Sequence, residues 1–347
     1  MSAGNLDRVS SLPLTRGAAR TVSAGLGLLA IILIVVAAHA ATGARPVAPH
    51  VFHDLIFAYD PKNFDQQILI RLRLPRIVAC LLAGASLGVA GLILQTVLRN
   101  PLGEPHILGL NAGASLAVVA LSASPFASIG VTSVQPLVAA GGAGAVFALV
   151  LALSAAGQRG LTPAKLVFCG IALSTLAGTL TSAILILNEE TLQQTRFWLV
   201  GDAAGITLPT IVNALPVAVI ALVLATALAP RLDLLALGEN AATALGVPVR
   251  LTWCLALIAT SLLCGVAISL VGPIGFIGLV VPPLISRIRT GRLLFAIPLA
   301  ALGGATLLIA ADLAARLLIG PRELPTGAMT GLVGAPVFLW LARGLLK

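Results

Sequence analysis

The stretch Leu74–Leu98, LPRIVACLLAGASLGVAGLILQTVL, decides the fold class of the chain. It contains a single charged side chain, Arg76, which lies close to its first residue. A helix rises about 1.5 Å per residue, so this stretch is long enough to cross the ~30 Å hydrocarbon core of a membrane. We therefore predict a transmembrane helix here.

Similar apolar runs recur along the whole chain, which has 347 residues, 59% of them hydrophobic and 10% charged. A soluble domain carries roughly 25% charged residues, so this chain has too few polar side chains to cover a surface in water. The runs number roughly ten, at about 21–41, 74–98, 106–123, 134–157, 164–187, 208–229, 249–270, 274–286, 293–318 and 325–344. The sequence therefore predicts an all-α polytopic membrane protein with about ten transmembrane helices.

The composition argues against two other classes of protein. A net charge of +9 could indicate a nucleic-acid-binding protein, but the basic residues are scattered one to three per loop and aromatic residues are few. The four cysteines all lie in apolar runs without CxxC spacing, and the four histidines form no helical metal-binding pair. We expect neither a disulfide framework nor a metal site.

The distribution of basic residues predicts the orientation. With the N-terminus inside and ten crossings, thirteen of the 21 Lys and Arg residues fall inside and eight outside, in agreement with the positive-inside rule. We expect residues 1–20 to form a cytoplasmic tail and residues 21–347 a single transmembrane domain, with the C-terminus also cytoplasmic. The first apolar run is followed by AHAATGA and imitates a signal peptide, but its length favours an uncleaved helix.

Three polar segments connect the predicted helices. Two lie outside, at about 42–70 and 188–207, and the second is predicted to be a short surface helix with Phe197 and Trp198 at headgroup level. The main inside connection, at about 230–248, is too polar and too interrupted to span a membrane. We expect it to form two short helices with a turn near Gly238.

The chain lacks the residues that competing functions need. A phosphate-binding loop requires a lysine after a glycine, and none of the three lysines follows one, so ATP binding through that motif is excluded. An ion-coupled secondary transporter, the main alternative, needs a carboxylate at mid-membrane. Asp312 lies near the outer end of its helix, spaced i, i+4 from Arg316, so we expect a structural or docking pair. An intramembrane enzyme would need a catalytic constellation in the apolar runs, and none is visible.

Two segments resemble each other weakly. LLAGASLGVAGLILQTVLRNPLGEP (81–105) and LLCGVAISLVGPIGFIGLVVPPL (262–284) both run through spaced glycines to an end marked by proline. Their predicted positions give them opposite orientations, which is the pattern of an inverted repeat in transporters. Glycine-rich membrane helices also resemble each other without common origin, and the sequence leaves both explanations open.

The inside connection carries a short motif, GENAATALG (238–246). An acidic residue is followed by two alanines and, after three further residues, by a glycine. Small alanines allow a short helix to enter a cleft of a partner protein, and the glycine permits the turn beyond it. This pattern resembles the coupling motif of ABC importers.

Four segments together resemble one family. They are RLRLPRIVACLLAGASLGVAGLILQTVLRNPLGEPHILGLNAGAS (71–115), LALGENAATALGV (235–247), GPIGFIGLVVPP (272–283) and ELPTGAMTGLVGAPVFLWLAR (323–343). They are similar to the permease subunits of FecCD-type, or type II, ABC importers for iron–siderophore complexes, haem and cobalamin, and the resemblance covers about residues 20–347. One departure is Pro282-Pro283, where relatives commonly have a Pro-His pair, followed by a shortened inside loop.

The resemblance implies a set of partners. Members of this family form permease homodimers or heterodimers in the bacterial inner membrane. Two cytoplasmic ATPase subunits, which hold ATP and Mg, dock on the loop that corresponds to residues 231–248, and a periplasmic binding protein delivers the substrate to the outer face. The permease would then be neither an enzyme nor a cofactor-binding protein. We expect an iron–siderophore complex as substrate, with haem and cobalamin as alternatives.

The resemblance also implies roles for particular residues. Docking of the binding protein falls on Arg73, Arg76 and Arg316. Coupling to the ATPase falls on Leu237, Gly238, Glu239, Ala241, Ala242 and Gly246. The translocation pathway is lined by Ser174, Thr175, Thr179, Ser182, Thr326, Met329 and Thr330, and the inner gate lies at Thr162, Pro163 and Ala164.

The segment RLRLPR (71–76) is the main exception to the positive-inside rule, because it places three arginines outside. Pro75 suits the first turn of a helix, where its missing N–H costs nothing, and would hold Arg73 and Arg76 facing outward. Anchoring beside anionic headgroups is one explanation. With Arg316 expected at the same surface, we favour a basic docking site for an acidic partner.

Overall fold

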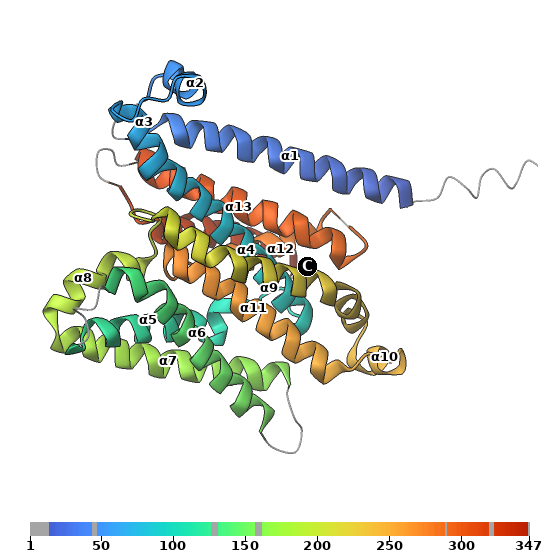
Figure 1. Cartoon of the computed structure of the whole chain (residues 1–347). Helices are drawn as coiled ribbons and strands as arrows, with labels where there is room; N and C mark the ends of the chain where they lie inside the picture. The colour runs from blue at the N-terminus through green and yellow to red at the C-terminus, as the bar shows by residue number, and fades with distance from the viewer. Residues whose placement is uncertain are drawn as a thin grey trace, which may run out of the picture.

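The computed structural model describes residues 14–43, 47–125, 131–156, 162–288, 290–318 and 323–345. Every regular element in these ranges is helical (Figure 1). Within them, seven helices are long and apolar enough to cross a membrane, and three shorter apolar helices bring the set to ten. The all-α polytopic fold predicted from the sequence is confirmed.

The helices follow the predicted apolar runs, with differences at their ends. The long helices are α1 (Leu14–Ala41), α4 (Leu74–Leu98), α6 (Val131–Ala155), α7 (Pro163–Leu187), α9 (Leu208–Ala236), α11 (Val249–Val271) and α13 (Leu293–Leu318). The shorter apolar helices are α5 (Leu110–Ser122), α12 (Ile277–Ser286) and α14 (Thr326–Leu345), and the short connecting helices are α2 (Pro49–Phe57), α3 (Phe64–Ile68), α8 (Glu189–Val200) and α10 (Glu239–Ala244). Because α1 begins at Leu14, the end of the predicted 1–20 tail is helical; residues 1–13 lie outside the described part.

The helix that contains RLRLPR begins earlier than expected. α3 passes through a π-turn, Leu69–Arg73, into α4, and together they form one helix of 35 residues. Asn63 caps its first turn, where its side chain accepts the backbone N–H of Asp65 at 3.0 Å. Pro75 therefore lies inside a helix and not at its start. We attribute the π-turn to this proline, whose ring would clash with the carbonyl of a regular preceding turn.

α4 lies at the centre of the bundle, where it packs against α9, α11, α12 and α13. Eighteen of its 25 residues are buried, which explains why it is apolar on every side. Its glycines allow the closest contacts. A Cβ at Gly84 or Gly88 would overlap the backbone of α13 around Gly304, and one at Gly91 would overlap Gly278 of α12. Small residues at these positions let the helix backbones touch.

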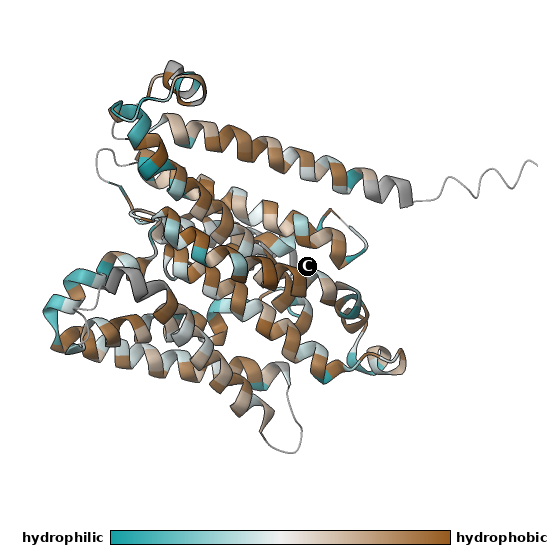
Figure 2. Cartoon of the chain, viewed as in Figure 1, coloured by the Kyte–Doolittle hydropathy of each residue, from teal (hydrophilic) through white to brown (hydrophobic). Residues whose placement is uncertain are grey.

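The connections gather at two ends of the bundle. α2, α3 and α8 lie at one end, named here the α8 end, and α10 lies at the opposite end, named the α10 end (Figure 1). Figure 2 shows hydrophilic residues concentrated at these two ends, whereas the helices between them are mainly hydrophobic. This distribution is expected for a bundle whose middle is in contact with lipid.

Two of the three predicted polar connections, at about 188–207 and 230–248, differ in how well they match the structure. The predicted surface helix corresponds to α8, which Asn188 caps by accepting the N–H of Thr191 at 3.1 Å. The expectation of two short helices in 230–248 is wrong, because α9 continues through Pro230 to Ala236 and only α10 follows. The buried leucines of the last turns of α9 hold it against the bundle, and this packing outweighs the one hydrogen bond that proline removes.

The two weakly similar segments each begin within a long helix, α4 or α11, and a short apolar helix follows, α5 just beyond the first segment and α12 within the second. Each connection contains a non-glycine residue with positive φ, Arg99 (48°) in the first and Phe276 (70°) in the second. The connections also meet, because Glu104 accepts the backbone N–H of Phe276 at 2.6 Å. A common origin of the two segments stays a prediction.

We expect Gly84→Ala to destabilise the folded protein, because the added methyl group would overlap the backbone of α13 at Gly304. Overpacking of this kind costs roughly 1–3 kcal/mol. Gly27→Ala in α1 is the matched control, since nothing lies within 4 Å of its Cβ position. Thermal unfolding of the purified variants would measure the difference, and equal midpoints would contradict the close packing of α4 on α13.

Candidate functional site

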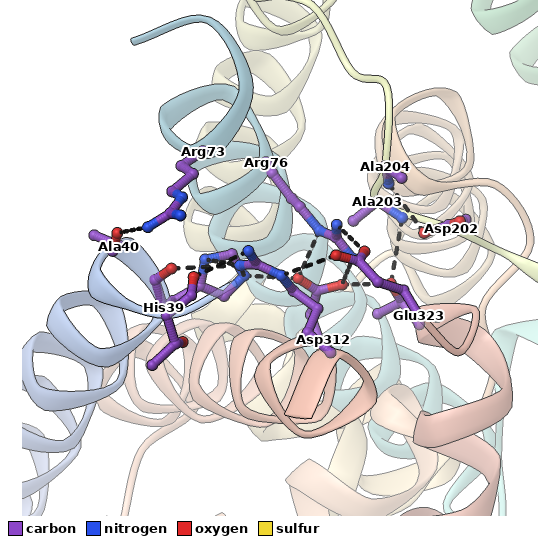
Figure 3. Close-up of polar contacts among 12 residues, drawn as sticks. His39, Ala40, Arg73, Arg76, Asp202, Ala203, Ala204, Asp312 and Glu323 are labelled. Atoms are coloured by element: carbon purple, nitrogen blue, oxygen red, sulfur yellow. Dashed lines mark hydrogen bonds and ion pairs between the residues drawn. The ribbon is translucent and has the colours of Figure 1, made fainter. Parts of the chain in front are cut away.

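A cluster of charged side chains at the α8 end joins the ends of several helices (Figure 3). Its members come from α1, from the helix formed by α3 and α4, from α13 and from the segment that precedes α14. They are His39, Arg73, Arg76, Asp312, Arg316 and Glu323, and we name them the charge cluster.

Asp312 lies at the centre of the charge cluster and is completely buried. Arg76 donates to both of its carboxylate oxygens, from Nε to Oδ2 and from Nη2 to Oδ1, each at 2.9 Å. His39 Nε2 lies 2.7 Å from Oδ2, and the hydroxyl of Thr326 donates to Oδ1 at 2.6 Å. A buried carboxylate is tolerated only when it is paired and hydrogen-bonded in this way. Asp312 therefore fastens α13 to α1, α4 and α14.

Glu323 forms the more accessible part of the cluster. Its Oε2 accepts from Arg76 Nη1 at 2.6 Å, and its Oε1 lies 3.4 Å from Arg316 Nε. The Glu323 side chain is 36% exposed, whereas those of Arg76 and Arg316 are 11% and 7% exposed. One carboxylate thus bridges two nearly buried guanidinium groups, with solvent on its open side.

Two arginines of the cluster also hold the end of α1. Arg316 donates to the carbonyl oxygens of His39 at 3.3 Å and Thr42 at 3.1 Å, and Arg73 donates to the carbonyl of Ala40. These carbonyls lie in the last turn of α1 or just beyond it, where positive charge is favoured by the helix dipole. The guanidinium groups therefore replace hydrogen bonds that the end of α1 would otherwise lack.

The outward orientation that we expected for Arg73 and Arg76 is wrong. They are 5% and 9% exposed, because the helix begins at Phe64 and both residues lie on its inner side. Arg71, within the same RLRLPR segment, is exposed. The expected i, i+4 pair between Asp312 and Arg316 is not observed either, since Asp312 binds Arg76 and Arg316 pairs with Glu323.

Sequence reasoning missed two members of the charge cluster, His39 and Glu323, and one further buried contact, that of Glu104. His39 was attributed to the signal-like sequence AHAATGA, although a histidine in an apolar run usually has a buried partner. Glu323 was quoted within ELP without a role. Glu104, which binds the N–H of Phe276 where α12 begins, follows a proline-rich turn and gave no signal of its own.

Asp202 lies in the connection between α8 and α9, close to the charge cluster (Figure 3). Burial raises the pKa of this carboxyl group, and the hydrogen bond from the backbone N–H of Ala204 acts in the opposite direction. In its own loop the side chain caps a turn, with a distance of 3.0 Å to that N–H. It is half-buried and lies in a connection between helices, outside the apolar runs.

The predicted coupling residues gather around α10. Leu237 and Gly238 form the turn from α9, where Gly238 has φ +115°, and Glu239 begins α10. Ala242 is fully buried, while Ala241 and Gly246 are exposed. Glu239 Oε1 lies 3.4 Å from Arg99 Nη2, which ties α10 to the end of α4.

A cavity of about 560 Å³ opens beside this ion pair. Its walls include Gln95, Arg99 and Asn100 from the end of α4 and Pro283 and Arg287 from α12 and the residues after it. Pro283, the departure from the family pattern, thus faces this cavity at the α10 end.

The predicted pathway residues divide into two groups. Thr175, Thr179 and Ser182 are exposed on α7, and Ser174 is half-buried. On α14, by contrast, Thr326, Met329 and Thr330 are 0%, 6% and 3% exposed. Thr326 contacts Asp312 and the α8–α9 connection, and Met329 packs with Ala311 and Ala315 of α13. Their role in lining a translocation pathway stays a prediction. Among residues 326–340 of α14, the exposed ones are Ala328, Leu332, Pro336, Leu339 and Trp340.

The predicted inner gate forms the start of α7. Thr162 is the N-cap residue, and its hydroxyl accepts the backbone N–H of Lys165 at 3.4 Å. Pro163 occupies the first helical position, where its missing N–H is not needed. Ala164 follows and is exposed.

Comparison with known proteins gives the family. Residues 29–344 match the FecCD transport family. The chain belongs to this family. It is 35% identical to the siderophore transport system permease YfiZ of Bacillus subtilis over 318 residues, covering 91% of the chain and 94% of that protein. It is 43% identical over 288 residues to the vitamin B12 import system permease BtuC of Vibrio cholerae, covering 80% and 83%.

A solved structure agrees with this assignment. A metal-chelate type ABC transporter in an inward-facing conformation matches with a TM-score of 0.78 at 28% identity, covering 92% of the chain and 98% of the solved chain. The FecCD protein described here is therefore a multi-pass permease subunit of a bacterial ABC importer. ATP hydrolysis is not its own activity, and the family is not one of cofactor-binding proteins.

We expect Asp312→Ala to destabilise this permease strongly, because it leaves Nε and Nη2 of Arg76 and Nε2 of His39 buried without their acceptor. Removal of one partner of a buried ion pair costs about 3–5 kcal/mol. Arg71→Ala removes an exposed charge from the neighbouring turn and should change the thermal unfolding midpoint little. Similar midpoints for the two purified variants would show that the charge cluster does not hold the helices together.

Proposed function

We propose that this FecCD permease forms the membrane pathway for an iron–siderophore complex, which a periplasmic binding protein delivers and ATP hydrolysis in separate subunits drives. The family match over residues 29–344 carries this proposal, and a relative named for siderophore transport that aligns over 91% of the chain supports the substrate. Cobalamin is the second candidate, because a vitamin B12 permease is 43% identical. Haem was a further expectation from the resemblance.

The proposed orientation places the α8 end in the periplasm and the α10 end in the cytoplasm, together with both termini. The excess of basic residues in the segments assigned to the cytoplasm supports this orientation. The binding protein would then meet the charge cluster, and the ATPase would meet α10.

The proposed partner in the membrane is a second permease subunit, either another copy or a related chain. One face of α7 supports it, because Phe168, Thr175 and Thr179 are exposed on a helix that is mostly uncovered. A pathway between two such subunits would be lined by Ser174, Thr175, Thr179 and Ser182, with the gate at 162–164. Small and hydroxylated side chains suit a bulky polar ligand that is bound weakly.

The proposed ATPase contact is α10 with the turns on either side of it, within residues 231–248. α10 protrudes from the bundle (Figure 1), and Ala242 packs against the bundle while Ala241 stays exposed. The proposed binding-protein contact remains on Arg73, Arg76 and Arg316. Since these side chains are nearly buried, contact with a partner would take place at the open rim of the charge cluster, where Glu323 lies.

Purification of the intact complex from native membranes tests the proposal as a whole. We expect mass spectrometry to identify an ATPase, a binding protein and either one or two permease chains, with an iron–siderophore complex as the bound ligand. A corrin ligand would transfer the proposal to cobalamin. Recovery of an active transporter without any ATPase would contradict the importer assignment.

We expect Glu239→Lys to abolish stimulation of ATP hydrolysis by the binding protein while the permease still inserts and folds. The reason is that Glu239 begins the helix on which the ATPase docks. Arg99→Ala is the matched control, because it removes the internal partner of Glu239, and an ion pair about half exposed contributes only ~0.2–1 kcal/mol. ATPase assays on reconstituted complexes would compare the two variants. Equal losses of stimulated ATP hydrolysis would show that Glu239 acts only through its ion pair with Arg99.

A further inference from the structure

The two carboxylates of the charge cluster differ in how firmly they are held. Asp312 is completely buried and accepts hydrogen bonds from three side chains. Glu323 is 36% exposed and is held by Arg76 at 2.6 Å and, more loosely, by Arg316 at 3.4 Å. Asp312 is thus a fixed part of the fold, whereas Glu323 is the carboxylate that a partner protein can reach.

Glu323 covers the two guanidinium groups that an acidic side chain of the binding protein would have to contact. The guanidinium groups of Arg76 and Arg316 are both almost inaccessible, and Glu323 contacts both of them. Figure 3 shows Glu323 beside Arg76. Arg316 Nε is buried, and at 3.4 Å from Glu323 it makes no hydrogen bond. A better-placed carboxylate would therefore gain a donor that Glu323 leaves unused.

We propose that Glu323 is a built-in competitor of the binding protein: it covers Arg76 and Arg316 in the free permease, and an acidic side chain of the docked protein replaces it. This inference rests on the proposed docking role of the charge cluster. The exchange substitutes one carboxylate for another, so no guanidinium group is left buried without a partner, a state that would be very costly.

The exchange would act on the start of α14. Glu323 lies three residues before Thr326, whose hydroxyl contacts both Asp312 and the backbone N–H of Ala203. Gly327 donates to the carbonyl of Gly201 at 2.9 Å, which fixes the same turn to the α8–α9 connection. Release of Glu323 would therefore change the contacts beside α14, while Thr326, Gly327 and the hydrogen bond from the Leu324 N–H to the carbonyl of Ala315 at 3.2 Å keep the helix in place.

The test measures the affinity of the permease–ATPase complex in nanodiscs for the binding protein recovered by co-purification. If Glu323 competes, Glu323→Gln should tighten binding by roughly 3- to 10-fold, since the partner no longer has to displace a charged group. Glu323→Asp keeps the charge but is too short to reach both arginines, and it should tighten binding less. Glu189→Gln removes an exposed charge from α8 at the same end and should change the affinity by less than about twofold.

Unchanged or weaker binding by Glu323→Gln, in a variant that retains its thermal unfolding midpoint, would overturn the inference. If Glu323→Gln does not fold, the affinity of Glu323→Asp decides in the same way. Arg316→Gln separates this inference from the docking role itself. If Arg316→Gln binds more weakly but the Glu323 variants do not bind more tightly, only the competitor role of Glu323 is contradicted. If Arg316→Gln binds as tightly as the unchanged permease, the docking role of the charge cluster is contradicted as well.

Discussion

The direct contact between the backbones of α4 and α13 determines the rest of this structure. In a membrane, helices gain little from burying apolar surface against each other, so close association depends on small residues that let backbones touch. Gly84 lies against Gly304 and Gly88 against Ala300. The helices are antiparallel, and the same register brings Arg76 opposite Asp312, since each lies eight residues from the glycine of its own helix. The glycine contact therefore positions the buried ion pair.

That register also limits what can be predicted from the sequence. The ten apolar helices follow from hydropathy, because the hydrocarbon core requires long apolar segments with internally satisfied backbones. The charge cluster does not follow from it. Arg76 and Asp312 are 236 residues apart, and their pairing depends on how two helices align in space. The i, i+4 spacing of Asp312 and Arg316 predicts an ion pair within one helix. In the structure Asp312 pairs with Arg76, and Arg316 pairs with Glu323.

The same reason explains the errors at helix ends. RLRLPR predicts the start of a helix, because Pro75 suits a first turn. In the structure the preceding polar residues, FDQQ, form a further turn that Asn63 caps, and the helix tolerates the proline through a π-turn. The residues around His39 in the sequence do not indicate its role either, because its partner Asp312 lies on another helix. Residues whose role depends on distant partners could not be assigned from spacing alone.

The continuous helix of α3 and α4 links the two proposed contact regions. Its 35 residues extend roughly 52 Å. The part from Arg73 in the charge cluster to Arg99, which contacts Glu239 at the start of α10, covers roughly 39 Å. Glycine contacts fasten this helix to α12 and α13 along its middle. Because the backbones already touch, α4 has no room to move by itself, and packed interfaces change between discrete arrangements instead of deforming gradually. A rearrangement that starts at either end must therefore move α4, α12 and α13 together.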